Sequence, residues 1–170
     1  MYTNEDNVPT SAFISIHQCL SSKLINNVVV YSQDASVKAT AQWDTGATTT
    51  CIAKHLVDDL HLVPTGMTRI QTPSGTKVVS NYLIDIILPN NVRIANIAVC
   101  ETEIGSQGID VLIGMDIILN GDFSVSNYVG QTSFTFRIPS RKKTDYVAEV
   151  NAEKMKARIG THGKGKRKRK

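Results

Sequence analysis

The stretch Ala41-Gln42-Trp43-Asp44-Thr45-Gly46-Ala47-Thr48 decides how this sequence is interpreted. Apolar residues alternate with polar ones up to Trp43, which is the two-residue period of a half-buried strand. The alternation stops at Asp44-Thr45-Gly46, and Gly46 permits a tight backbone that could hold Asp44 at the strand end. An ordinary Asx turn that ends the strand explains the tripeptide equally well. The stretch alone therefore leaves two interpretations open, a structural turn and a presented carboxylate.

A second apolar strand, Asp110-Val111-Leu112-Ile113-Gly114, ends at a glycine 70 residues after Asp44 and enters a short helical turn. Between the two lies Gln71-Thr72-Pro73-Ser74-Gly75-Thr76. Proline at the second position and glycine at the fourth suit a type I turn. That turn predicts a projecting hairpin formed by residues 68–71 and 77–80. A loop, a helix, a hairpin, long strands and an apolar-Gly strand therefore follow one another in a defined order.

Taken together, these segments resemble the retropepsin-like aspartic proteases, the single-lobe relatives of the retroviral proteases, over about residues 25–140. The resemblance implies a catalytic Asp44 in an active-site loop, with residues 112–114 packed beside that loop and residues 72–76 as a flap over the substrate. Besides Asp44, it assigns Thr45, Gly46 and Ala47 to the loop, Ser74 and Gly75 to the flap, and Leu112, Ile113 and Gly114 to the packing segment.

The resemblance also implies a mechanism, that of an aspartic endopeptidase acting on polypeptide substrates. Each chain would supply one Asp44 to a homodimer, so that two carboxyl groups face each other and share one proton. The ionised member would act as a general base on water, while the protonated member would stabilise the oxygen of the scissile carbonyl. No metal and no cofactor are expected.

The sequence departs from the retroviral pattern at several positions. Thr48 follows the loop where an acidic residue is usual, and Met115 follows the apolar-Gly segment where arginine is common. These two family positions often pair with each other, so the loss of both is self-consistent. The flap tip has one glycine, and a 30-residue basic extension at the end of the chain has no counterpart in the retroviral core. The dimer contacts of this chain are therefore expected to differ.

The fold expected from the strand periodicity is all-β, a retropepsin-like closed β-barrel lobe with one or two short helices. The helices are predicted at about 52–62, with Leu56, Leu60 and Ile52 on one face, and at 115–119. Asn90-Asn91 and Gly130 predict the turns of two hairpins. We predict an N-terminal lead-in over residues 1–24, a protease domain over 25–140 and a basic tail over 141–170, of which 144–159 can form a helix and 160–170 should be disordered.

The net charge of +4 hides an asymmetry along the chain. Residues 1–140 carry a net charge of −5 and residues 141–170 one of +9, so the tail alone is basic. This tail is compatible with weak contact to nucleic acid or to an acidic partner. An alternative function follows, in which the same fold is a non-catalytic dimeric binding module and Asp44 is a turn residue.

The cysteines, the histidines and the apolar runs give no indication of a disulfide-stabilised, metal-binding or membrane protein. The three cysteines form no CxxC pair and predict no disulfide framework, His55 and His61 are spaced wrongly for one metal site, and Cys51 is more simply a core residue than a nucleophile. No signal peptide is recognisable, and no apolar run approaches the roughly 20 residues that cross a bilayer. We therefore expect a cytoplasmic protein with no membrane contact.

Overall fold

Short segments of alternating polarity form the strands of two β-sheets. The computed structural model describes residues 2–3, 13–19, 23–33, 35–72, 75–104 and 108–163. The larger sheet contains β1 (Tyr2–Thr3), β3 (Ile25–Ser32), β4 (Ala35–Trp43), β5 (Cys51–Ala53), β6 (Gly66–Thr72), β7 (Gly75–Ile87), β8 (Arg93–Thr102) and β9 (Val111–Ile113). Six of these strands close into a barrel in the order β8-β5-β9-β4-β3-β7, since β7 pairs again with β8. The predicted all-β closed barrel is confirmed.

The second sheet packs against one side of the barrel and has the order β10-β11-β2. It consists of β10 (Asp122–Tyr128), β11 (Gln131–Ile138) and β2 (Phe13–Cys19). The predicted hairpin around Gly130 is confirmed, because Tyr128 pairs with Gln131 across the turn. Strand β2 lies inside the segment 1–24 that was expected as a lead-in, and it pairs with β11 along its whole length.

An aromatic cluster joins the two sheets immediately before the Asp44 loop. Trp43, the last residue of β4, stacks on Phe123 with ring centroids 5.4 Å apart and also contacts Phe134 and Phe136. Its indole N–H donates a hydrogen bond to the buried side-chain oxygen of Asn26. Because rings of this size bury much apolar surface, the cluster fixes the end of β4 firmly in the core.

The two predicted helices near residues 52–62 and 115–119 are α1 (Lys54–Asp59) and α2 (Met115–Ile118). The first prediction was wrong at its start, because Ile52 belongs to β5, where its side chain is fully buried. Its apolar spacing to Leu56 fits a helix, yet the strand pairing of β5 with β8 and β9 determines its conformation.

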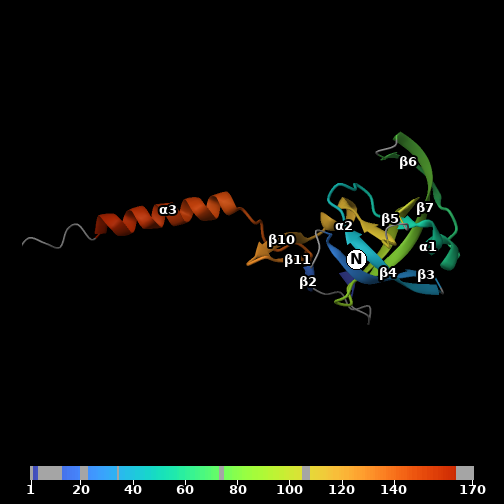
Figure 1. Cartoon of the computed structure of the whole chain (residues 1–170), viewed down its shortest axis with the longest axis horizontal. Coiled ribbons are helices and arrows are strands. Elements are labelled where there is room, and N and C mark those ends of the chain that lie inside the picture. Colours follow the sequence, from blue (N-terminus) through green and yellow to red (C-terminus); the bar gives the residue numbers. More distant parts are fainter. Residues whose placement is uncertain are drawn as a thin grey trace, which may run out of the picture.

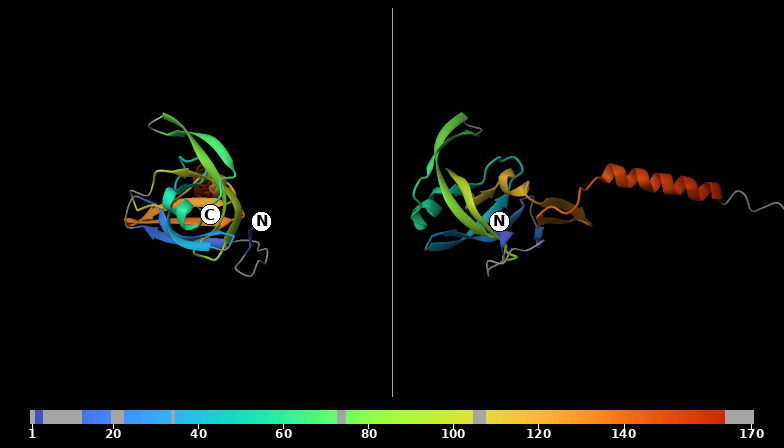
Figure 2. Two further views of the ribbon diagram at one scale, coloured as in Figure 1. Left: turned by 90° about the vertical axis from the view of Figure 1, so that its right-hand side faces the viewer. Right: turned by 180° about the vertical axis from the view of Figure 1, so that it is seen from behind.

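The C-terminal helix α3 (Tyr146–Gly163) extends away from both sheets (Figures 1 and 2). Its side chains from 147 to 159 are exposed on every face. The helix continues through Gly160, where the predicted helix ended, and residues 164–170 of the predicted disordered end lie outside the described residues. Within the described part of the chain, no helix has the length and hydropathy needed to span a membrane.

A long hairpin rises from the barrel on the same side as the loop between β4 and β5 (Figures 1 and 2). It is formed by β6 and the first half of β7, in register from Gly66 opposite Asn81 to Thr72 opposite Gly75. The projecting hairpin predicted from the Pro73-Gly75 spacing is therefore confirmed. The second half of β7 forms part of the barrel wall, where it pairs with β3 on one side and β8 on the other.

Candidate active site

The chain places Asp44 and Gly114 next to each other at the ends of two parallel strands. Trp43 at the end of β4 is in register with Ile113 at the end of β9. The backbone N–H of Asp44 donates to the carbonyl oxygen of Ile113 at 2.9 Å. Two segments that are distant in sequence thus leave the sheet side by side. Asp44 and Gly114 both follow directly on strands, as predicted from the sequence.

A tight turn presents the Asp44 carboxylate at the surface. The N–H of Gly46 donates to Asp44 Oδ1 at 2.8 Å, and the N–H of Ala47 donates to the Asp44 carbonyl oxygen at 3.2 Å. Asp44 and Ala47 are half-buried, while Thr45 and Gly46 are exposed. This arrangement is the Asx turn considered above, and it fixes one carboxylate oxygen while the residue stays accessible.

The absence of a side chain at Gly114 allows the loop to lie against the apolar-Gly segment. A Cβ atom built there would be 2.7 Å from the backbone carbon of Thr49 and 3.0 Å from the carbonyl oxygen of Ala47. Next to it, the N–H of Met115 donates to that same Ala47 oxygen at 2.8 Å. Ile113 is fully buried and Leu112 half-buried. The packing segment therefore touches the loop through backbone atoms.

The buried hydroxyl of Thr50 and the carboxylate of Asp116 stabilise this contact between Gly114 and the loop. Thr50 is fully buried, and its hydroxyl donates to Asp116 Oδ1 at 2.7 Å while accepting the N–H of Gly114 at 3.1 Å. Asp116 Oδ2 accepts the N–H of Thr50 at 2.8 Å, and Oδ1 also accepts the N–H of Ile117. Asp116 therefore has a structural role beside the loop. Thr50 was not anticipated, because nothing in the run Thr48-Thr49-Thr50 shows which hydroxyl points inward.

The hairpin tip brings a conformationally unusual glycine over this side of the barrel. Gly75 has a φ of +119°, which favours glycine, and its carbonyl oxygen accepts the Thr72 hydroxyl at 2.8 Å. Ser74, the other residue predicted in the flap, lies outside the described residues, as does Pro73.

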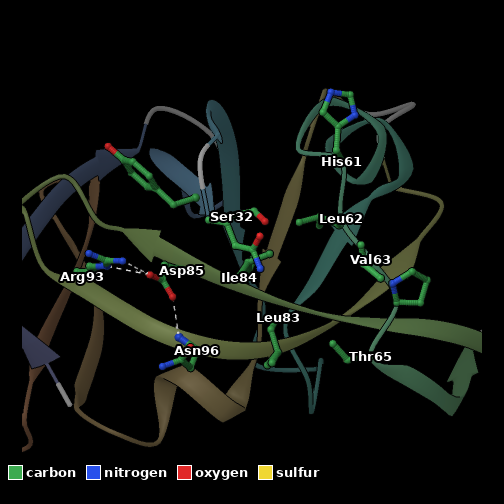
Figure 3. Close-up of a pocket in the computed structure, with 13 residues that line it drawn as sticks. Ser32, His61, Leu62, Val63, Thr65, Leu83, Ile84, Asp85, Arg93 and Asn96 are labelled. Carbon is green, nitrogen blue, oxygen red and sulfur yellow. Dashed lines mark hydrogen bonds and ion pairs between the residues drawn. The ribbon is translucent and has the colours of Figure 1, made fainter.

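A surface cavity of about 480 Å³ is separate from the Asp44 loop (Figure 3). It lies between the end of β3, the segment after α1 and strands β7 and β8, and Asp85 inside it pairs with Arg93 and accepts the N–H of Asn96. None of residues 44–50 lines it.

Across the described residues, no three His, Cys, Asp or Glu side chains are grouped as a metal site.

Comparisons with known proteins agree with this arrangement. Residues 28–117 match the family described as aspartyl protease. The structure resembles that of a retropepsin-like aspartic protease from Rickettsia conorii with a TM-score of 0.50 and 15% identity, over 77% of this chain and 98% of that chain.

Two further solved structures are similar at lower scores. The simian foamy virus protease has a TM-score of 0.41 and 19% identity, over 58% of this chain and 92% of that chain. A Legionella pneumophila protein of unknown function has a TM-score of 0.37 and 17% identity, over 56% of this chain and 84% of that chain. No match was found among curated proteins. From the family match, the chain belongs to the aspartyl protease family, and its single closed barrel has the retropepsin-like fold.

Proposed function

We propose that this chain is an aspartic endopeptidase that works as a homodimer, with Asp44 of each subunit forming the catalytic pair. The observation that carries the proposal is the Asp44 turn. The carboxylate stands at a rigid strand end, one of its oxygens is oriented by the N–H of Gly46, and the residue remains accessible. A reacting group needs this combination of fixed orientation and access.

The hydrogen bonds made by the neighbouring carboxylate, Asp116, support a site that is completed by a second subunit. Asp116 is the other acidic residue bonded into this site, and both of its oxygens already accept hydrogen bonds from Thr50 or Ile117. These hydrogen bonds tie Asp116 to Thr50 and to the start of α2, which is a structural role. The partner carboxylate would therefore be Asp44 of a second copy, brought opposite by a two-fold axis. Thr45, which is exposed beside Asp44, would brace the two loops across this axis.

In the proposed reaction, the ionised Asp44 takes a proton from a water molecule held between the two carboxyl groups. The water oxygen attacks the scissile carbonyl carbon, and the protonated Asp44 of the other subunit donates a hydrogen bond to the developing oxygen. The tetrahedral intermediate then collapses as a proton passes to the leaving nitrogen. The substrate would be an extended polypeptide between the 44–47 loop and the β6–β7 hairpin, and closure of the hairpin would exclude bulk water.

The experiment compares wild type with Asp44→Asn on a complex peptide library at about pH 4 to 7, reading new termini by mass spectrometry. Asparagine keeps an oxygen for the Gly46 hydrogen bond but cannot exchange the catalytic proton. We expect cleavage by wild type alone, insensitive to chelators. Asp58→Asn, at an exposed position on α1, is the matched control and should cleave like wild type.

Two other results would contradict the proposal in different ways. Cleavage by both wild type and Asp44→Asn would remove Asp44 from the chemistry. Cleavage by neither, with both proteins folded and dimeric, would favour the non-catalytic binding module. In that case, truncation after Ser140 should abolish binding to an acidic or nucleic-acid partner, while Asp44→Asn should leave it intact.

A further inference from the structure

Two of the three cysteines meet beside the candidate active site, although they are 49 positions apart in the sequence. Cys51 begins β5 and Cys100 lies near the end of β8, and the two are direct partners in a parallel strand pair. Their sulfur atoms are 3.0 Å apart, and both are free thiols. The third cysteine, Cys19, is in the other sheet opposite Thr132.

The position of this pair allows a disulfide without rearrangement of the strands. Neighbouring strands are roughly 4.7–4.9 Å apart, within the range of about 4.4–6.8 Å between Cα atoms that a disulfide tolerates. The side chains are already turned toward each other. Cys100 is fully buried, but Cys51 is half-exposed, so a small oxidant can approach the pair from the side of Cys51.

The two thiols also influence each other's ionisation. Their shared hydrogen bond lowers the pKa of Cys100, against the opposing effect of burial. The same hydrogen bond, together with burial, raises the pKa of Cys51. Cys51 is therefore the thiol that keeps its proton and Cys100 the one that ionises first, and a thiolate is the form of cysteine that reacts.

We propose that Cys51 and Cys100 are an oxidation site that hydrogen peroxide converts to a reversible disulfide between β5 and β8. One sulfur attacks the O–O bond and becomes a sulfenic acid, and the hydroxide that leaves takes up a proton to form water. The second sulfur then attacks the sulfenic sulfur and expels a second water. Two thiols and one peroxide thus give one disulfide and two waters, and the order of attack does not change this balance.

The bond would act on the segment that carries Asp44. Cys51 Sγ lies 3.3 Å from the carbonyl oxygen of Thr49, to which its thiol donates while Cys100 is still protonated, and the backbone of Thr49 is the surface on which Gly114 packs. Oxidation removes the thiol proton and with it this hydrogen bond, while it fastens the start of β5 to β8. We therefore expect the disulfide to disturb the 44–50 loop and to lower peptide cleavage severalfold. The expected effect on cleavage rests on the proposed function, whereas the formation of the disulfide does not.

The experiment treats the reduced full chain with hydrogen peroxide and measures intact mass, peptide maps and cleavage before and after addition of dithiothreitol. We expect the loss of two hydrogen atoms, a mapped Cys51–Cys100 bond, and lowered cleavage that the reductant restores. Cys19→Ser should respond in the same way. Cys51→Ser should form no intramolecular disulfide. Cys100→Ala should also form none, and alanine is chosen there because serine would place a hydroxyl at a fully buried position.

The outcomes separate the two proposals. Peroxide-treated chains that carry only sulfinic acid, or a bond through Cys19, would overturn the disulfide. A mapped Cys51–Cys100 bond with unchanged cleavage would overturn its effect on the loop. A mapped bond in a chain that never cleaves peptide would leave the oxidation site standing and remove the proposed function instead.

Discussion

At the scale of single residues, the contact between Gly114 and Thr49 leaves no space for a side chain at position 114. The backbone of Gly114 has a φ of −90° and a ψ of −175°, which any residue adopts, so the requirement for glycine is steric. In Gly114→Ala, the new methyl would meet the Thr49 backbone at 2.7 Å. We expect a loss of about 1–3 kcal/mol in the free energy of unfolding, because overpacking of this kind costs that much.

Cleavage by Gly114→Ala should fall further than its stability, because the strain is transmitted to the turn that holds Asp44. Denaturant unfolding and peptide hydrolysis measure the two effects. Gly66→Ala is the matched control, since nothing lies within 4 Å of a Cβ built there. Equal stability and activity in the two alanine variants would show that the 112–114 segment does not support the loop.

The same scale shows what the sequence could and could not predict of the site. Asp44 and Gly114 were identified because strand ends and glycines leave a recognisable pattern in sequence. Thr50 could not be identified, since its hydrogen bonds to Asp116 and Gly114 join positions 66 and 64 residues away. Pairings over such distances are set by the barrel, and no local pattern encodes them.

At the scale of elements, the β10–β11 hairpin and the segment that follows it are held together by one carboxylate. Asp122 at the start of β10 accepts hydrogen bonds from the Ser140 hydroxyl, the N–H of Arg141 and the Arg137 guanidinium. These contacts, the Ser140 hydroxyl most of all, hold the pKa of Asp122 well below its usual range. The fold therefore favours the ionised form.

The pH dependence follows from the direction of that shift. Stability contributed by Asp122 is fully present above its unfolded pKa, near 4, and is lost as pH falls toward the lower folded pKa. We expect Asp122→Asn to melt below wild type at about pH 7, with the difference shrinking toward about pH 3. Thermal melts across that range measure it, with Asp58→Asn as the exposed control. A constant difference at every pH would contradict this role.

Element types were predictable where the polarity of the side chains alternates, as in β4. The start of α1 was not, because the burial of Ile52 by strand neighbours outweighs its helical spacing to Leu56. The pairing of β2 with β11 joins segments more than a hundred residues apart and has no local signal. The domain boundaries at 25 and 140, and a cytoplasmic location, remain predictions.

At the scale of the whole molecule, the proposed site is completed only by a second chain, and subunit mixing tests this directly. Asp44→Asn subunits should exchange with wild type, because the substitution keeps the turn. A mixed dimer has one carboxyl group opposite an amide and cannot share the catalytic proton. In an equal mixture at fixed total protein, random pairing leaves about a quarter of the dimers with two wild-type subunits.

Activity in that mixture should therefore fall to about a quarter of the wild-type value once the subunits have exchanged. If each chain worked alone, activity would fall only to about half, because half of the chains would still be wild type. Mixing wild type with Asp58→Asn should leave activity unchanged, which controls for the dilution and mixing steps, and exchange itself is followed by native mass spectrometry of the mixed dimers. A time course of peptide hydrolysis after mixing distinguishes the two values, and a stable plateau at half would show that a single Asp44 is sufficient.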